Sequence, residues 1–277
     1  MILTAMSQNI QIGAHQDGRW EELVGAIRDV DPDLLLLQEV EWLAGPEQAK
    51  AAREGLGMNL VVAPSRQMNP AVAWKPGVLE WLDTDTRYSA TDMHHGYCSL
   101  QLRPLGLAKE WPVPLVAIST HLTPYSVEAA GQEAQLLIAR AYRFGGIGLV
   151  GGDINHMPLG DEEPDWSLIP PYNRSSRCHR RKSSTDPWCG NRLVGEVFRD
   201  GDMTDVAAHV ADSRPDPSLR ALTGKGGQLR VDQFHVTPAL APAIRDYRRV
   251  DTKADHYGIV ATFDLDQVDL AAISTYT

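Results

Sequence analysis

The sequence predicts an α+β fold in which a few helices cover a β-sandwich. Two features lead to this prediction. Strand-like apolar runs are numerous and alternate with only a few helical patterns, and no Pro/Gly/Ser-rich linker interrupts the chain. A length of 277 residues with 43% hydrophobic residues is enough for one large core, so we expect residues 1–277 to form a single domain.

The first part of the chain has the pattern of a strand, a helix and a second strand. The run ILTAMSQNI alternates as a strand does, and DLLLLQEV is apolar enough for a strand buried on both faces. Between them, residues 17–30 predict a helix with Asp17 as its N-cap. Its apolar face consists of Trp20, Leu23, Val24, Ile27 and Val30. Residues 46–56 predict another helix, which ends at Gly55 or Gly57.

The rest of the chain is mostly strands. The runs NLVVA, AVAWK, VLEWL, YCSLQLR and VPLVAIST favour an antiparallel meander between residues 58 and 120. Residues 126–144 predict the longest helix, with Ser126 as its N-cap. Its small apolar face consists of Val127, Ala130, Ala134, Leu137 and Ala141. The strand IGLVGGD follows, then an irregular, Pro-rich segment at 156–192 whose length suggests a functional loop. QLRVDQFHV, AIRDYRRV and YGIVATFDL predict the last strands.

The composition limits the compartment and the partners. No run of eighteen apolar residues occurs, so we expect no transmembrane helix. The first residues lack a signal-peptide pattern and three cysteines favour a reducing compartment, which together predict a cytoplasmic protein. A removed secretion signal and a disulfide between Cys178 and Cys189 are left open. The net charge of −10 argues against a surface that binds polyanions as a whole, but it permits local basic patches.

Polar residues stand at the ends of the predicted strands. The set comprises Asn9, Gln38, Glu39, Thr120, His121, Asp153, Asn155, Asp232, Asp255 and His256. Each residue alone is explained by a turn or by a solvated strand end. Because every apolar strand would have to end in such a group by accident, we expect the strand ends to converge on one reaction centre.

The chemistry of this set favours phosphoryl transfer. Convergence would crowd the carboxylates of Glu39, Asp153, Asp232 and Asp255 into one cleft. Like charges in a partly dry site need a cation, and oxygen ligands of this kind suit Mg²⁺ or Mn²⁺. The histidine and asparagine side chains add hydrogen-bond donors for phosphoryl oxygens. The set therefore predicts metal-assisted transfer of a phosphoryl group to water.

The order of these motifs resembles the endonuclease/exonuclease/phosphatase superfamily, which has the pancreatic-deoxyribonuclease-like fold. The matching segments are SQNI, LLLLQEV, STHL, GGDIN, RVDQFHV and ADHYGI, which span residues 7–258 in the family's order. The resemblance implies a four-layered α/β/β/α sandwich, with two mostly antiparallel sheets packed face to face and helices outside. It also implies a divalent-metal-dependent phosphoesterase.

The resemblance further implies a role for each matching residue. Glu39 corresponds to the principal Mg²⁺ ligand, with Asp255 and Asn9 near the metal or the phosphate. Asp153 resembles the residue that orients or deprotonates the attacking water, and Asn155 the residue that holds the phosphoryl group.

Two histidines complete the set that the resemblance implies. His256 resembles a second acid–base group whose tautomer Asp232 fixes, and His121 a donor to a non-bridging phosphoryl oxygen. Histidine at this last position fits the branches that contain deoxyribonucleases, tyrosyl-DNA phosphodiesterases, deadenylases, inositol-phosphate phosphatases and sphingomyelinases. Ala254 departs from the family, which usually carries a serine there, and removes a hydroxyl that would support the loop. His156 has no matching role.

Residues 156–192 concentrate positive charge directly after one of these strand ends. Basic residues interleaved with aromatic ones suit a nucleic-acid backbone and its unstacked bases. We therefore expect substrate binding by Tyr172, Arg177, Arg180, Arg181, Lys182 and Trp188. A solvated loop that carries charge for solubility is the alternative. Cys178, His179 and Cys189 also allow a zinc knuckle, although their spacing is irregular.

The sequence thus predicts a Mg²⁺- or Mn²⁺-dependent nuclease with DNA as its expected substrate. The alternative is a phosphatase or phosphodiesterase of a small phosphorylated metabolite or a lipid headgroup, which the overall acidity of the chain favours. A catalytically inactive binding module is disfavoured because Glu39, Asp153, Asn155 and His256 are all present. The choice between DNA and RNA, and between internal and terminal cleavage, is left open.

Overall fold

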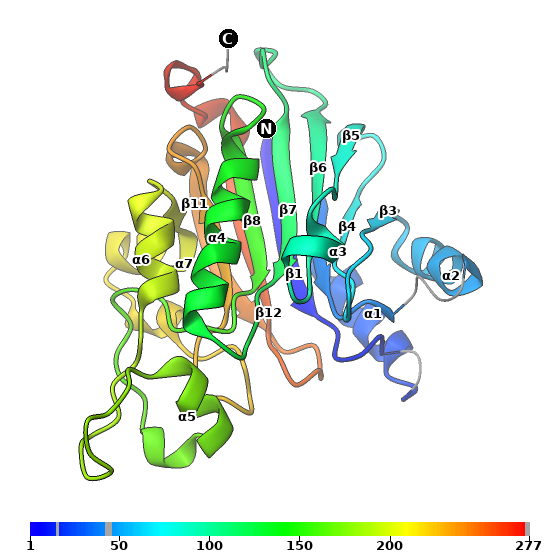
Figure 1. The fold of residues 1–277 in the computed structure, drawn as a ribbon. Coiled ribbons are helices and arrows are strands. Elements are labelled where there is room, and N and C mark those ends of the chain that lie inside the picture. The colour runs from blue at the N-terminus through cyan, green and yellow to red at the C-terminus, as the bar shows by residue number, and fades with distance from the viewer. Residues whose placement is uncertain (15–16, 42–45, 275–277) are drawn as a thin grey trace.

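The computed structural model describes residues 1–14, 17–41 and 46–274, and within them two six-stranded sheets pack face to face (Figure 1). The first sheet runs in the order β11 (Ile244–Val250), β12 (Gly258–Asp264), β1 (Ile2–Asn9), β2 (Leu34–Gln38), β4 (Ala71–Trp74), β3 (Asn59–Val62). The second runs in the order β5 (Leu79–Asp85), β6 (Tyr97–Pro104), β7 (Leu115–His121), β8 (Ile147–Asp153), β10 (Asp232–Val236), β9 (Thr204–Asp205). Neighbours are antiparallel except for the pairs β1–β2 and β7–β8.

Helices lie outside the sheets and complete the predicted α+β sandwich. The α-helices are α1 (Trp20–Val30), α2 (Pro46–Leu56), α3 (Ser89–Asp92), α4 (Val127–Tyr142), α5 (Pro171–Arg177), α6 (Leu193–Asp200) and α7 (Val206–Ser213). Short 3₁₀ helices are Trp166–Leu168, Pro217–Arg220, Ala241–Ala243, Leu265–Gln267 and Leu270–Ala272. No helix in the described ranges is both long enough and apolar enough to cross a bilayer.

Alternation along the strands explains how both faces of each sheet are buried. On β2, Leu34 and Leu36 face the other sheet, whereas Leu35 and Leu37 pack against the outer helices α1 and α2. On β7 and β8 the same alternation divides the apolar residues between the inter-sheet core and the cluster under α4 and α6. The sequence predicted a doubly buried strand at DLLLLQEV, and the structure confirms it.

Most predicted elements are confirmed, and three predictions need correction. Asp17 is not the N-cap of α1; Arg19 holds that position without a side-chain cap, and the Asp17 carboxylate pairs with the Arg19 Nε at 2.6 Å. The expected meander divides between the sheets, because the chain crosses from one sheet to the other after β4. By contrast, Ser126 caps α4 as predicted, accepting the Ala129 N–H at 3.3 Å.

The third correction concerns residues 156–192, which are not an irregular loop throughout. They contain a 3₁₀ turn and α5, and they pack on their own small core around Met157, Trp166 and Ile169. The fully buried Arg230 guanidinium ties the segment to the second sheet, with Nε at 2.9 Å from Asp161 Oδ2 and Nη2 at 2.8 Å from Asp205 Oδ2. Helices α3, α5, α6 and α7 were not predicted.

Two glycines let β8 lie between its neighbours. A Cβ at Gly151 would lie 2.5 Å from the Phe234 ring, and a Cβ at Gly152 would lie 1.9 Å from the Thr120 carbonyl oxygen. The second approach is to backbone, which no rotamer change relieves. The glycine pair of GGDIN therefore permits the close pairing of β7 and β8 that places Asp153.

Gly152→Ala is expected to lower the free energy of unfolding by about 3 kcal/mol, the upper end of the usual cost of overpacking a core. Urea denaturation measures the change. Gly25→Ala is the matched control, because a Cβ there meets nothing within 4 Å and the position lies within α1. That variant should gain about 0.5–1 kcal/mol from helix propensity. Equal stability of the two variants would contradict this account of β8.

Candidate active site

Strand register brings the polar strand ends to one end of the sandwich. Asn9 at the end of β1 is opposite Gln38 at the end of β2. In the other sheet, His121 at the end of β7 is opposite Asp153 at the end of β8, and Asp232 on β10 pairs with Asp153 from the other side. Because parallel strands end at a common edge, the two parallel pairs present their last residues together.

Asp153 lies at the centre of this cluster. Its Oδ2 accepts a hydrogen bond from Asn9 Nδ2 at 3.2 Å and lies 3.5 Å from His121 Nε2 and 3.8 Å from His256 Nε2. Its Oδ1 accepts the backbone N–H of Asn155 at 2.9 Å. Burial alone raises the pKa of Asp153, but nearby histidine and arginine charges outweigh it and lower the pKa. The structure therefore holds an ionised carboxylate away from bulk water.

Glu39 lies beside Asp153 and is less buried. Its Oε1 accepts a hydrogen bond from Asn9 Nδ2 at 2.9 Å, and its Oε2 accepts the Ile12 N–H at 2.9 Å. Its backbone is left-handed, with φ of 61°, and Asn155 has φ of 62°. This conformation is uncommon for a glutamate, whereas asparagine adopts it more readily. The two residues follow β2 and β8, at the same end of the sandwich.

His256 and Asp232 form a hydrogen-bonded pair. His256 Nδ1 lies 2.8 Å from Asp232 Oδ2, and because a carboxylate only accepts, the ring nitrogen is the donor. This bond leaves Nε2 on the side of Asp153. Burial alone lowers the pKa of His256, but the charges of Asp232 and Asp153 outweigh it and raise the pKa to about 10.

Asp255 lines a pocket next to this pair, and Lys225 supports its loop. Desolvation raises the pKa of Asp255 against the effect of His256, and the negative charges of Glu39 and Asp153 add to the rise. The Lys225 ammonium donates to the Ala254 carbonyl at 2.7 Å, and its backbone N–H donates to the Asp255 carbonyl at 2.9 Å. A lysine thus supports the loop in which Ala254 stands where the resemblance implied a serine.

The donor set fits a hard divalent cation. Ligand atoms of Glu39, His121 and Asp153 lie within 4.8 Å of one another, and the pKa of Asp255 responds to the same carboxylates. The carboxylate oxygens of this set suit Mg²⁺ or Mn²⁺, whereas the imidazole of His121 is not a ligand that Mg²⁺ prefers. Asn9 is turned differently: its Oδ1 accepts a backbone N–H at 2.9 Å while its Nδ2 faces the carboxylates. Asn9 therefore links the carboxylates of Glu39 and Asp153 through its amide nitrogen.

His95 is a neighbour of the site that sequence reasoning missed. Its ring stacks on that of His121, with centroids 4.2 Å apart and an interplanar angle of 29°. Burial, with a further contribution from the charge of His121, lowers the pKa of His95 to about 3, so the ring is neutral. The stack restricts the orientation of His121. Nothing in the sequence around His95 distinguished it from an ordinary loop residue.

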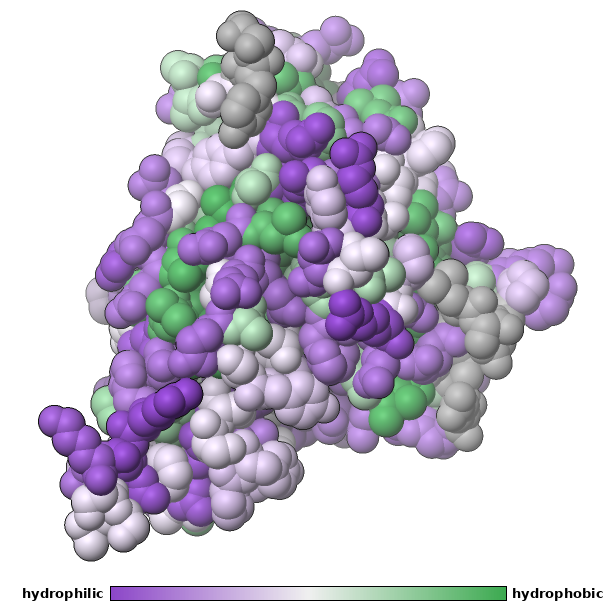
Figure 2. Space-filling view, in the orientation of Figure 1, coloured by the Kyte–Doolittle hydropathy of each residue, from purple (hydrophilic) through white to green (hydrophobic). Residues whose placement is uncertain are grey.

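The structure separates the six predicted substrate-binding residues into two groups. Arg177 and Tyr172 lie on α5 and line the pocket that also contains Asn155, Asp255 and His256. The others, Arg180, Arg181, Lys182 and Trp188, line a separate hollow in the segment that projects beside α5, where strongly hydrophilic atoms gather at the lower left of Figure 2.

The second group is partly engaged within its own segment. The Arg181 guanidinium lies 3.7 Å from the centroid of the Trp188 ring and donates to the carbonyls of Ser184 and Asp186 at 2.8 and 3.0 Å. One face of the tryptophan is therefore already stacked. Arg180 and Lys182 are exposed.

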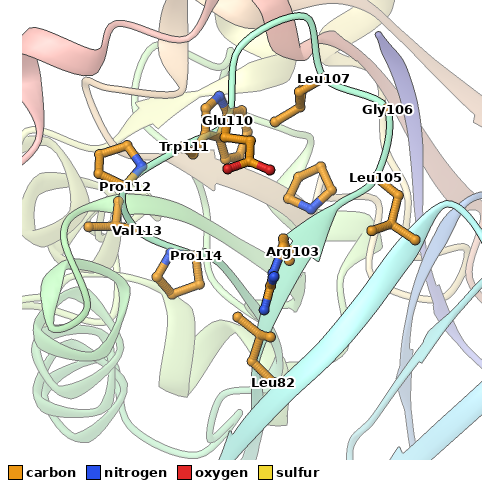
Figure 3. A pocket seen from close by; sticks show the side chains of 11 residues that line it. Leu82, Arg103, Leu105, Gly106, Leu107, Glu110, Trp111, Pro112, Val113 and Pro114 are labelled. Atoms are coloured by element: carbon orange, nitrogen blue, oxygen red, sulfur yellow. The ribbon is translucent and has the colours of Figure 1, made fainter.

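Two other candidate sites have fewer side chains that could bind a ligand or take part in a reaction. A cavity of about 420 Å³ under the loop that connects β6 and β7 lies at the end of the sandwich opposite α5, and among the described residues Arg103 and Glu110 are the charged ones that line it (Figures 1 and 3). The cysteines Cys178 and Cys189 are free, and within the described ranges they belong to no cluster with metal-ligand geometry.

Comparisons with known proteins support the fold. No protein-family model and no curated protein matches the chain. Several solved structures match the chain. TDP2 of D. rerio, complexed with single strand DNA product, has a TM-score of 0.63 at 13% identity, over 95% of this chain and 99% of that chain. ANGEL2, a 2′,3′-cyclic phosphatase, has a TM-score of 0.61 at 14% identity, over 96% of both chains.

A third structure carries the family name. An endonuclease/exonuclease/phosphatase family protein from Bacteroides thetaiotaomicron has a TM-score of 0.59 at 14% identity, over 96% of this chain and 99% of that chain. The fold and the site together define the class of this protein: a two-sheet α+β sandwich with acidic and histidine side chains at its strand ends. The chain shares its fold with these three structures, one of which is an endonuclease/exonuclease/phosphatase family protein, and this agrees with the fold that the sequence resemblance implied.

Proposed function

We propose that the chain is a divalent-metal-dependent phosphoesterase that hydrolyses phosphodiester bonds, with DNA as substrate and Mg²⁺ or Mn²⁺ as cofactor. The observation that carries the proposal is the position of Asp153, whose Oδ2 lies within 3.8 Å of Asn9, His121 and His256 from both sheets. The DNA-bound TDP2 structure, which shares the fold, supports a nucleic-acid substrate.

In this mechanism Glu39 and Asp255 would hold the metal, beside the carboxylate of Asp153. A divalent cation bound there would neutralise charge on the phosphoryl oxygens. Asp153 orients a water molecule for in-line attack and accepts its proton. As the new phosphorus–oxygen bond forms, the bond to the leaving oxygen breaks, and His256 donates its Nε2 proton to that oxygen.

The remaining side chains orient these groups. Asp232 accepts the Nδ1–H of His256 and so fixes the ring with Nε2 toward the reacting atoms. Asn155 and His121 donate to non-bridging oxygens, where negative charge increases in the transition state. Asn9 holds the carboxylates of Glu39 and Asp153 in register.

A comparison of substrates tests this proposal. The protein is incubated with Mg²⁺ or Mn²⁺ and either plasmid and oligonucleotide DNA or a panel of phosphorylated metabolites. We expect DNA cleavage that EDTA abolishes. Turnover of a small phosphoester without cleavage of any nucleic acid would contradict the nuclease proposal and leave the phosphoesterase chemistry intact.

The size of the pocket beside His256 favours the alternative, in which the substrate is a small phosphoester. The pocket beside His256 has a volume of about 200 Å³. This is below the roughly 300–1,000 Å³ of sites that enclose drug-sized ligands, so it suits a phosphate with a short substituent. The net charge of −10 also favours a small substrate, because an acidic protein repels the negatively charged backbone of nucleic acid.

The exposed cations of the basic segment provide a further test of nucleic-acid binding. Replacing Arg180 and Lys182 together by Gln is expected to reduce the slope of log affinity against log salt by about 2, because each phosphate contact contributes about 0.9. Filter binding over a salt series measures it. Arg103→Gln with Arg199→Gln is the control, since it removes the same charge at positions away from α5. An unchanged slope would exclude phosphate contacts by Arg180 and Lys182.

A further inference from the structure

Arg177 is a buried cation without an ionic partner. It ends α5, and only 6% of its surface is exposed. Its Nη2 donates to Asn155 Oδ1 at 2.9 Å. Within the described residues no carboxylate lies within ion-pair distance of its guanidinium, and its buried Nε has no hydrogen-bond partner. Burial lowers its pKa, with the charge of Asp153 opposing the change.

Arg230 shows what a structural buried arginine looks like in the same chain. Its side chain is fully buried as well, yet it makes hydrogen bonds to both Asp161 and Asp205, through Nε, Nη1 and Nη2. An arginine removed from water without such partners lowers the stability of the fold, because the lost hydration is not replaced. Arg177 has one direct hydrogen-bond partner, which is neutral, and the charge of Asp153 acts on it from beyond ion-pair distance. Its remaining guanidinium donors therefore have no anion in contact with them.

The surroundings of Arg177 indicate which anion fits. Arg177 lines the pocket of about 200 Å³ that also contains Asn155, Asp255 and His256. The turn at residues 224–227 also lines this pocket, and a Cβ at Gly227 would lie 3.2 Å from Arg177 Nη1. Glycine thus leaves the guanidinium accessible to a small ligand. A planar fork of N–H donors matches the oxygens of a phosphate group.

We propose that Arg177 binds a phosphate group in this pocket, with Nη2 holding Asn155 and the other guanidinium donors contacting non-bridging oxygens. The proposal rests on the proposed function. It adds to it a second positively charged side chain at the phosphoryl group, besides His256, and this side chain comes from α5. It also distinguishes Arg177 from Arg180, Arg181 and Lys182, which line a separate hollow.

Binding of inorganic phosphate tests the proposal without turnover. Isothermal titration calorimetry is performed with Mg²⁺ and again with EDTA, on the wild type, Arg177→Met, Arg177→Lys and the control Arg199→Met. Arg199 lies on α6 with a side chain 60% exposed. We expect Arg177→Met to weaken phosphate binding by at least about tenfold, the usual scale for a charged hydrogen bond, and Arg177→Lys to have an intermediate effect. Arg199→Met should bind as the wild type does.

Stability in phosphate-free buffer separates ligand binding from a structural role. Replacing an unpaired buried charge by an apolar side chain of similar size should leave the melting temperature of Arg177→Met equal to or above that of the wild type. A large fall in melting temperature, equal phosphate affinity of both proteins, or no phosphate binding by the wild type would each overturn the proposal. Absence of any hydrolysis together with Arg177-dependent phosphate binding would instead contradict the proposed function alone.

Discussion

Asp153→Asn is expected to lower the rate of phosphodiester hydrolysis by at least about 10²-fold, the usual scale for loss of an acid–base group. The substitution keeps the shape of the side chain and removes its charge. Asp153 Oδ2 is the atom on which Asn9, His121 and His256 converge, at 3.2, 3.5 and 3.8 Å. A neutral amide can neither accept the proton of the attacking water nor balance the histidine charge.

Initial rates with saturating substrate and Mg²⁺ measure this effect, and circular dichroism checks that the variant is folded. Asp83→Asn is the matched control, because it makes the same chemical change at an exposed position on β5. The control should retain the wild-type rate. If Asp153→Asn remains within a factor of ten of the wild type, the assignment of Asp153 to water activation is incorrect.

The fold could be predicted because its signals are local. A strand that is buried on both faces must be apolar throughout, and DLLLLQEV is; a helix with one buried stripe must repeat its apolar residues, and 126–144 does. The division of the strands between two sheets was not predictable in this way. It depends on where the chain crosses after β4, and neither sheet has a sequence signature of its own.

The candidate site likewise contains residues that could be predicted from the sequence and residues that could not. Asn9, Glu39, His121 and Asp153 end strands, so their convergence could be predicted from strand order and from the family resemblance. Arg177 could be predicted only as one cation among several. Its burial depends on the packing of α5 on a small core around Met157 and Trp166, and on glycines more than forty residues away in the chain. His95 and Lys225 reach the site by tertiary contacts alone.

His256 and Asp232 are expected to act as one unit, and a double-mutant cycle tests this. His256→Gln and Asp232→Asn should each lower the rate of hydrolysis by at least about 10²-fold. The 2.8 Å bond from Nδ1 to Asp232 Oδ2 sets the ring orientation and stabilises its charge, so each substitution removes the same function. The double variant should then be no slower than the slower single variant by more than about threefold, as for residues that function only together. Multiplied losses would mean that Asp232 acts on the reaction independently of His256. Such a result would exclude the orienting role that its burial on β10 and its contact with the ring support.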